Sequence, residues 1–143
     1  MNVNSEVKFD LDSFYSRESI QEWKQIIGDQ LHYHFGYFHG GEDLETGLKQ
    51  TVRNFYPYIT SGARVLDIGC GWGAPAKMLI AERNCSVTGI SCSTAQVEYC
   101  RSQGLNVLQQ DLDQDNGSYI DEYDTIFSLE MISHIRNKVQ LLQ

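Results

Sequence analysis

The chain has 143 residues, of which 41% are hydrophobic, and this length suits one domain with a small core. Its formal net charge of −8 argues against a nucleic-acid or anionic-membrane surface, because contact with phosphate groups needs a basic patch. The polar N-terminus predicts no secretory leader, and no apolar run is long enough for a membrane span.

The first 62 residues predict a helical N-terminal cap. Ser16 is placed to cap a first helix, and an aromatic, turn-rich stretch follows at 32–41. The apolar positions of this helix are Ile20, Trp23, Ile27 and Leu31. A second helix is expected from Glu42 to about Tyr56, ended by Pro57 and Gly62. Its apolar face consists of Leu44, Leu48, Val52 and Phe55.

From residue 63 onward the pattern changes to alternating strands and helices. The expected strands are Arg64–Ile68, Ser86–Ser91, Asn106–Gln110 and Tyr123–Ser128. The helices between the first three are Pro75–Arg83 and Thr94–Gln103, and Ser93 with Gln96 has capping-box spacing before the second. Short apolar strands that alternate with helices predict an α/β fold, with a parallel sheet covered by helices on both faces.

The segment 65–73, Val-Leu-Asp-Ile-Gly-Cys-Gly-Trp-Gly, predicts a buried strand that ends in a glycine-rich turn and opens a helix. Gly69, Gly71 and Gly73 let the backbone approach a ligand closely, and Pro75 suits the first turn of a helix. The free N–H groups at such a helix start favour an anionic group. The turn lies at the carboxyl end of its strand, where open α/β sheets bind ligands.

A turn of this kind serves either a dinucleotide or S-adenosylmethionine. The dinucleotide pattern places a third glycine where this chain has Ala74, a substitution that the pattern sometimes tolerates. A carboxylate buried beside the turn, Asp67, would repel a pyrophosphate but would favour a sulfonium or an ammonium group. These features favour S-adenosylmethionine.

At this point the chain resembles motif I of the class I S-adenosylmethionine-dependent methyltransferases. The resemblance extends to the branch that contains tocopherol, sterol and cyclopropane-fatty-acid enzymes, and it covers the chain from about residue 31 onward. The segments that carry it are 33–37, 65–73, 87–96, 110–111 and 123–134. It implies a Rossmann-like sheet of strand order 3-2-1-4, with the cap at 1–62 and the cofactor-binding half at 63–143. It also implies methyl transfer from S-adenosylmethionine to a small-molecule acceptor.

The resemblance implies a role for the residues around the turn. Gly69, Gly71 and Gly73 would meet the methionyl carboxylate through backbone N–H groups. Asp67 would accept hydrogen bonds from the motif backbone and favour the ammonium group, with a structural cap as the alternative. Tyr33 and Tyr37 of the cap would contact the sulfonium by cation–π attraction, or else pack at a helix end.

The adenosine half is assigned to residues that follow the second, third and fourth strands. Ser91, Ser93 and Gln96 would bind the ribose, although Ser93 is as well explained as a helix cap. Many class I members carry an acidic residue at the position of Ser91, and this chain departs from that pattern in the same way as the branch it resembles. The remaining implied contacts are Asp111 to the adenine amino group, Leu112 flanking the ring, and Ser128 and Leu129 on the methyl-donor side.

His134 and Glu130 are the candidates for substrate chemistry. A histidine can act as a base or a polar anchor at neutral pH, and a partly exposed helix histidine is the alternative reading. Ser133-His134 stands where cyclopropane-forming relatives have Glu-His, which argues against that reaction. No metal is expected, because His32, His34 and His39 have no carboxylate or thiol nearby in the sequence. The four cysteines fit no zinc pattern and favour reduced thiols in a cytoplasmic protein.

The family sheet has seven strands, and only four are found here. Residues 132–143 are expected to form one amphipathic helix, with Ile132, Ile135, Val139 and Leu142 on its apolar face. A sheet that ends on the fourth strand exposes an unpaired edge, which predicts a C-terminally truncated fragment or a sheet completed by a second chain or another copy. The alternatives to a methyltransferase are a non-catalytic S-adenosylmethionine-binding or regulatory fragment and, more weakly, a nicotinamide-dependent dehydrogenase.

Overall fold

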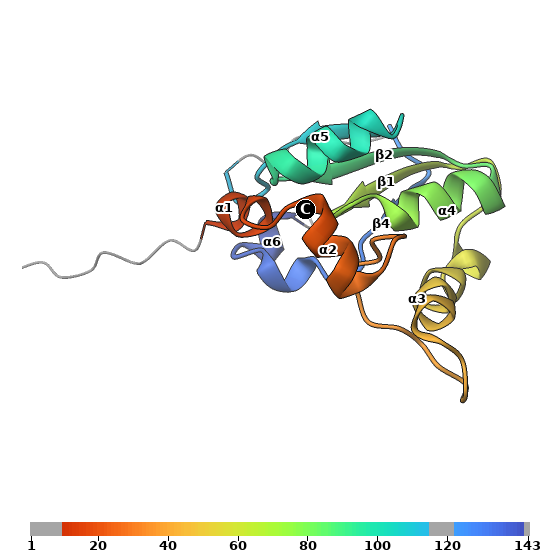
Figure 1. Cartoon of the computed structure of the whole chain (residues 1–143). Helices are drawn as coiled ribbons and strands as arrows, with labels where there is room; N and C mark the ends of the chain where they lie inside the picture. The colour runs from red at the N-terminus through yellow and green to blue at the C-terminus, as the bar shows by residue number, and fades with distance from the viewer. Residues whose placement is uncertain (1–9, 115–121, 142–143) are drawn as a thin grey trace, which may run out of the picture.

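The computed structural model describes residues 10–114 and 122–141, and it contains one four-stranded sheet of order β3-β2-β1-β4 (Figure 1). The strands are β1 (Arg64–Ile68), β2 (Ser86–Ser91), β3 (Asn106–Gln109) and β4 (Thr125–Phe127). Every neighbouring pair is parallel, which confirms the predicted fold class and strand order. The fourth strand is shorter than the expected Tyr123–Ser128.

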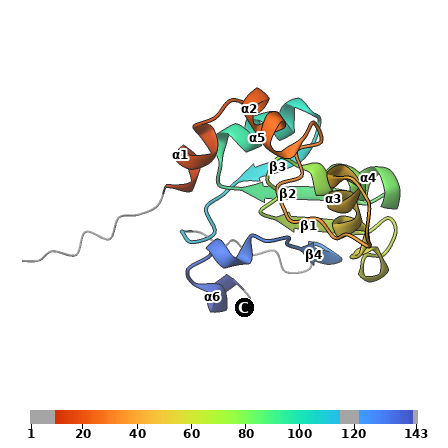
Figure 2. The same cartoon turned by 60° about the horizontal axis from the view of Figure 1, so that its bottom comes forward.

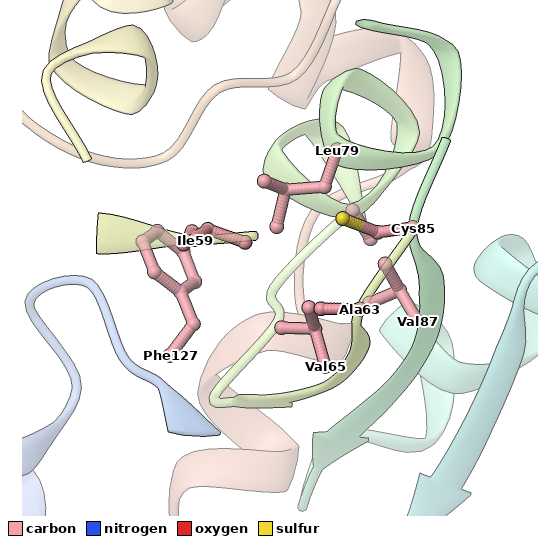
Figure 3. Close-up of a cluster of buried hydrophobic side chains, with 8 residues drawn as sticks. Ile59, Ala63, Val65, Leu79, Cys85, Val87 and Phe127 are labelled. Carbon is pink, nitrogen blue, oxygen red and sulfur yellow. The ribbon is translucent and has the colours of Figure 1, made fainter. Parts of the chain in front are cut away.

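One face of the sheet carries the helices α4 (Ala74–Arg83) and α5 (Thr94–Ser102). Alternate residues of a strand point to opposite faces, so Val65 packs toward α4, where it meets Leu79 and Val87 (Figure 3). Leu66 and Ile68 point to the other face and pack with Ile90, Leu112 and Ile135.

That second face is covered by the C-terminal segment, which contains η2 (Ile132–His134) and α6 (Lys138–Leu141) and packs Met131, Ile135 and Leu141 against the sheet. In Figure 2, α6 lies below β4. The prediction of one continuous helix here is wrong. The backbone is extended at Ile135, whose side chain is 7% exposed within the core. The next N–H, of Arg136, donates to the Asp113 carboxylate at 2.8 Å. Core packing and this bond therefore replace the helical continuation, and Leu142 lies outside the described residues.

The N-terminal cap contains α1 (Leu11–Ser16), α2 (Ile20–Ile27), α3 (Leu44–Arg53) and the 3₁₀ turn η1 (Tyr56–Tyr58). The sequence predicted Ser16 as the N-cap of α2, and this prediction is wrong because Ser16 is the last residue of α1. Ser19 is the cap, in a reciprocal capping box with Glu22. Gly28, at φ 83°, ends α2, so Leu31 is buried from a loop rather than from a helix.

The helix α3, which corresponds to the second helix predicted for the cap, begins after Asp43, whose carboxylate accepts a hydrogen bond from the Thr46 N–H. Leu48 and Val52 are buried as expected, whereas Leu44 is 55% exposed and Phe55 is 37% exposed. The apolar face of α3 is therefore narrower than the spacing predicted.

The helices α1 and α2 of the cap each contact the sheet domain. The Asp12 carboxylate of α1 accepts hydrogen bonds from the Thr94 N–H (2.7 Å) and hydroxyl (3.0 Å) at the start of α5. Trp23 of α2 packs against Trp72 of the glycine-rich turn, with ring centroids 6.1 Å apart. Within the described residues, no helix is long and apolar enough to cross a membrane.

Candidate active site

A pocket of about 480 Å³ lies at the carboxyl end of the sheet, between the strand ends and the cap. Its walls come from the glycine-rich turn, the end of β2, the segments after β3 and β4, α1, and the aromatic stretch of the cap. Ten of the predicted site residues line it: Tyr33, Gly69, Gly71, Ser91, Gln96, Asp111, Leu112, Leu129, Glu130 and His134.

The glycine-rich turn has left-handed backbone at each glycine, with φ of 76° at Gly69, 53° at Gly71 and 80° at Gly73. A Cβ on Gly69 would collide with the Met131 side chain, whereas one on Gly71 would meet nothing within 4 Å. The N–H groups of Gly71 and Trp72 have no acceptor among the described residues. The turn therefore presents a bare backbone surface to the pocket at Gly71.

Gly73 does not line the pocket. It is the N-cap of α4, and a Cβ there would collide with Leu105 and come within 3.0 Å of the Cys100 sulfur. This glycine permits close packing of the turn against α5, which differs from the ligand contact that the resemblance implied.

Asp67 is 1% exposed, at the bottom of the turn. A small cavity of about 20 Å³ lies beside it, lined also by Tyr33, His34 and Gly71. The expected hydrogen bonds from the motif backbone are absent within the described part of the chain. The N–H groups of Gly69 and Cys70 donate instead to the Ile90 carbonyl, and Asp67 Oδ2 has no partner there. Desolvation by burial raises the pKa of this carboxyl to about 7.

The end of β2 is organised by hydrogen bonds within the protein. The Ser91 hydroxyl donates to Gln96 Oε1 at 2.8 Å and accepts from the Ser93 N–H at 3.1 Å. Ser93 is 0% exposed, and its hydroxyl caps α5 by accepting from the Gln96 N–H, so it does not reach the pocket. These bonds leave the side-chain NH₂ of Gln96 as the polar group that can donate to a ligand. Because the Gln96 side chain turns toward Ser91, the full capping box is not formed.

The segments after β3 and β4 supply further lining residues. Asp111 is exposed and accepts from the Asp113 N–H, while Leu112 is 9% exposed. Ser128 does not line the pocket, and its hydroxyl donates to the Ile68 carbonyl at 3.1 Å. Leu129 lines both the large pocket and the small cavity beside Asp67.

The two cap tyrosines lie in different places. Tyr33 lines the pocket and packs edge-on against Trp23 and Tyr15, with centroid distances of 5.3 and 5.7 Å. Tyr37 is 51% exposed, outside the pocket lining, and packs edge-on against His39. Of these two tyrosines, Tyr33 alone lies on the pocket side of the cap.

Glu130 and His134 both line the pocket. Glu130 has φ 60°, and its carboxylate accepts from the Phe35 N–H at 2.9 Å, which joins the segment after β4 to the cap. His134 is exposed, in the 3₁₀ turn η2. No group of three or more His, Cys, Asp or Glu side chains within residues 10–114 and 122–141 is arranged to hold a metal ion.

One wall of the pocket was not predicted from the sequence. Leu11 and Tyr15 come from α1, which was not predicted, although Asp10 is a normal N-cap for it. His32, His34 and Phe35 were considered only as part of the cap or as a metal cluster, yet all three line the pocket. No periodic pattern could have found them, because the four consecutive residues 32–35 all line the pocket from a segment without regular secondary structure.

Comparison with known proteins gives consistent results. The model of the family described as methionine biosynthesis protein MetW matches residues 49–143. The cyclopropane-fatty-acyl-phospholipid synthase of Escherichia coli K12 is 30% identical over 122 residues, which cover 81% of this chain and 31% of that enzyme. The 27-O-demethylrifamycin SV methyltransferase of Amycolatopsis mediterranei is 29% identical over 130 residues, which cover 83% of this chain and 47% of that enzyme.

Solved structures show the same fold. The crystal structure of coclaurine N-methyltransferase bound to N-methylheliamine and SAH has a TM-score of 0.81 at 27% identity, covering 99% of this chain and 43% of that one. The cyclopropane synthase MmaA2 of Mycobacterium tuberculosis has a TM-score of 0.73 at 22% identity, covering 87% of this chain and 48% of that one. This second likeness concerns the fold alone.

The sheet order, the glycine-rich turn and these likenesses define a Rossmann-like protein of the class I S-adenosylmethionine-dependent methyltransferase type. Within that class, the chain belongs to the MetW family, whose model covers its last 95 residues, from 49 to 143. The chain spans between 31% and 47% of the length of the curated relatives described above.

Proposed function

We propose that the pocket binds S-adenosylmethionine and that the chain takes part in methyl transfer to a small-molecule acceptor. The observation that carries this proposal is the pairing of bare backbone at Gly71 with a buried, unpartnered carboxyl at Asp67. The free N–H groups of Gly71 and Trp72 suit the methionyl carboxylate, and the Asp67 side chain suits the ammonium group next to it. A dinucleotide offers a pyrophosphate instead, and Asp67 would repel it.

The adenosine half would follow the end of β2 and the segment after β3. The NH₂ group of Gln96 is free to donate to a ribose hydroxyl, and Ser91 holds that amide in place. Asp111 is available to accept from the adenine amino group, with Leu112 against the ring. Ser93 and Ser128 support these segments through their own hydrogen bonds rather than through ligand contact.

Residues 1–62 would act as a cap over the cofactor and 63–143 as the cofactor-binding half. Tyr33 is the cap residue placed to face a sulfonium, where cation–π attraction contributes roughly 0.5–2 kcal/mol. The packing of Trp23 on Trp72 supports this division, because it couples the cap directly to the glycine-rich turn.

When bound, S-adenosylmethionine supplies an electrophilic methyl group on a sulfonium, and the sulfur leaves readily as a neutral thioether. The main task of the protein residues is then to hold the acceptor atom in line with that methyl group. Leu129 and Glu130 border the site at the end of β4, and His134 lies at its open side, where it can orient the acceptor or take up its proton.

Complete activity would need a surface beyond the described sheet. Among the described strands, β4 pairs only with β1, and Ile126 on β4 is 61% exposed. A further strand, from a longer protein, a second chain or another copy, would cover this edge and add to the acceptor side. The four cysteines are unpaired, which fits a reducing compartment such as the cytoplasm.

A non-catalytic S-adenosylmethionine-binding module is the second candidate. The observation in its favour is that the Glu130 carboxylate already accepts from the Phe35 N–H, so that one of the two catalytic candidates is engaged in a cap contact. The two candidates share the cofactor site and differ only in the acceptor side of the pocket.

Calorimetric titration with S-adenosylmethionine, S-adenosylhomocysteine and NAD⁺ tests the shared site. We expect both sulfur compounds to bind and NAD⁺ to give no binding heat. Asp67→Asn should weaken S-adenosylmethionine, whereas the exposed variant Glu42→Gln should not. Binding of NAD⁺ without S-adenosylmethionine would overturn the proposal. Formation of S-adenosylhomocysteine with an added acceptor, abolished in His134→Ala, would favour the enzyme over the binding module.

A further inference from the structure

We propose that His32 is the hydrogen-bond acceptor for the hydroxyl group of the methyl acceptor, and that His34 holds His32 in the tautomer this role requires. The inference deepens the proposed methyl transfer and rests on it. It adds a residue and a substrate class to the site, because it assigns a hydroxyl-bearing molecule to the acceptor side of the pocket.

The tautomers follow from two contacts in the cap. His34 Nδ1 lies 2.9 Å from the Phe35 carbonyl oxygen, and His32 Nδ1 lies 3.0 Å from His34 Nε2. A carbonyl oxygen only accepts, so His34 Nδ1 carries its proton and neutral His34 offers Nε2 as an acceptor. His32 must then donate from Nδ1. The remaining nitrogen of neutral His32, Nε2, therefore carries a lone pair and no proton.

The position of His32 directs this lone pair to a ligand. The side chain is 3% exposed and lines the large pocket, and Nε2 has no hydrogen-bond partner among the described residues. Nε2 is not a fully buried polar atom, and the pocket is the space that His32 lines, so a donor that enters the pocket can reach this lone pair. Phe35, the neighbour of His34 in the chain, donates from its N–H to the Glu130 carboxylate, so the histidine pair lies near the segment after β4, which is the side of the pocket assigned to the acceptor.

Burial favours the neutral form of both imidazoles at physiological pH. Burial, followed by the neighbouring His34 and then Lys49, lowers the pKa of His32 to about 4, and Glu45 opposes this effect. Burial also lowers the pKa of His34, while the bond to the Phe35 carbonyl and the Glu130 carboxylate act in the other direction. His32 is therefore an acceptor rather than a cation when the ligand enters.

A weakly basic imidazole selects for a hydroxyl over a charged amine. As the methyl–sulfur bond breaks and the new methyl–oxygen bond forms, the hydroxyl becomes strongly acidic, and even this imidazole can take its proton at Nε2. The products are the methyl ether, S-adenosylhomocysteine and protonated His32, which donates from Nδ1 to His34, and the Glu130 carboxylate favours positive charge on His34. An alkylammonium would keep its proton against so weak a base.

Phenol and anisole form a matched pair of probes, because they share a ring and differ in the hydroxyl proton. The protein is saturated with S-adenosylhomocysteine, and each probe is titrated while the nitrogen-15 resonances of labelled histidines are followed. We expect phenol to bind about fivefold more tightly than anisole, the value of one hydrogen bond of about 1 kcal/mol. The phenol titration should move His32 Nε2 most, and Nε2 should be the unprotonated nitrogen before any probe is added.

Variants separate the acceptor from its support. His32→Phe should abolish the preference for phenol, and His34→Phe should reduce it by releasing the His32 tautomer. His39→Phe, on the same stretch but outside the pocket lining, should keep the full preference. His32→Gln, whose amide oxygen can still accept, should retain part of it.

The outcomes that overturn the inference are distinct from those that overturn the proposed function. Equal affinity for the two probes, no detectable binding of phenol, or a protonated Nε2 on His32 overturns the inference while S-adenosylhomocysteine still binds. Failure of S-adenosylhomocysteine to bind overturns the proposed function itself. If His32→Phe does not fold, the tautomer and the probe preference of the unmodified protein still decide the question.

Discussion

The pocket has two walls that are built in different ways. The cofactor wall consists of residues 69–72 and 91–96, which lie at the ends of the buried strands β1 and β2. Backbone bonds such as those from Gly69 and Cys70 to Ile90 hold it. The acceptor wall, residues 129–135 with cap residues 31–35, follows a strand of three residues. It contains left-handed backbone at Leu31 and Glu130, and a single side-chain bond, Glu130 to Phe35, joins its two halves.

This difference predicts how each part of such a site responds to substitution. Backbone bonds between adjacent strands do not depend on side-chain identity, so residues 69–72 keep their shape as long as their glycines and core residues remain. Residues 91–96 depend in addition on the side-chain bond from Ser91 to Gln96. The acceptor wall depends on individual side chains that reach across the molecule. We therefore expect substitutions in the cofactor wall to affect both folding and cofactor binding, and substitutions in the acceptor wall to affect mainly local order.

The largest effect is expected from Gly69→Ala. The backbone at position 69 is left-handed, which costs about 1–2 kcal/mol for an alanine. The added Cβ would also collide with Met131, which adds about 1–3 kcal/mol of overpacking. Chemical denaturation would measure the loss, and calorimetry would show weaker cofactor binding. Gly62→Ala is the matched control, because it has a similar φ of 80° and open space around its Cβ. Equal losses in the two variants would contradict the collision.

The next effect is the pH dependence that Asp67 gives to stability. The folded protein binds this proton more tightly than the unfolded chain does, since the carboxyl pKa rises from 3.8 to about 7. Its contribution is therefore fully present below about pH 4 and is lost as the pH rises to about 7, by about 4 kcal/mol. His32, with its lowered pKa, acts in the opposite direction as the pH falls.

Asp67→Asn isolates the carboxyl from the other titrating groups. Thermal unfolding of both proteins at about pH 5 and about pH 8 should show a smaller loss of stability at high pH in the variant than in the unmodified protein. His32 is present in both proteins, so its contribution cancels. A pH profile that is the same in both would show that Asp67 does not titrate in this range.

Glu130→Ala should loosen the acceptor wall without changing the cofactor wall. The variant loses the bond to the Phe35 N–H, worth about 1.5 kcal/mol, and keeps the same left-handed backbone strain. Hydrogen exchange should become faster at the Phe35 amide and stay unchanged at Gly69 and Cys70. Glu42→Ala, which removes a similar bond to the exposed His39 N–H, should leave Phe35 unaffected.

The smallest effect is expected where α1 meets α5. Thr94→Ala removes the hydroxyl bond to Asp12 but keeps the bond from its N–H, so about 0.5 kcal/mol should be lost. A double-mutant cycle with Asp12→Ala measures the coupling, which should be positive and below about 1 kcal/mol. A coupling of zero would show that α1 is held over the pocket by Leu11 and Tyr15 rather than by this bond.

The cofactor wall was largely predictable from the sequence. The bounds of β1 and β2 agree with the expected strands, because continuous apolar runs bounded by turn residues define buried parallel strands. The helix starts at Ala74 and Thr94 were expected to within one residue from Pro75 and Ser93. The acceptor wall was not predictable to this degree. The spacing of Ile132, Ile135 and Val139 fits one apolar helix face, but Ile135 is buried in the core while Val139 is 67% exposed.

By itself, the sequence determined the fold class and the glycine-rich turn, because these depend on local periodicity and on residues whose backbone needs are specific. The strand order and the methyltransferase class were implied by the resemblance of its motifs to that class. Only the tertiary structure decided which residues face the ligand. It showed that Gly73 packs against Leu105, that Tyr37 lies outside the pocket, and that His32 and His34 lie inside it. The physical reason is that side-chain direction in turns depends on contacts with distant segments, as the bond from Phe35 to Glu130 illustrates.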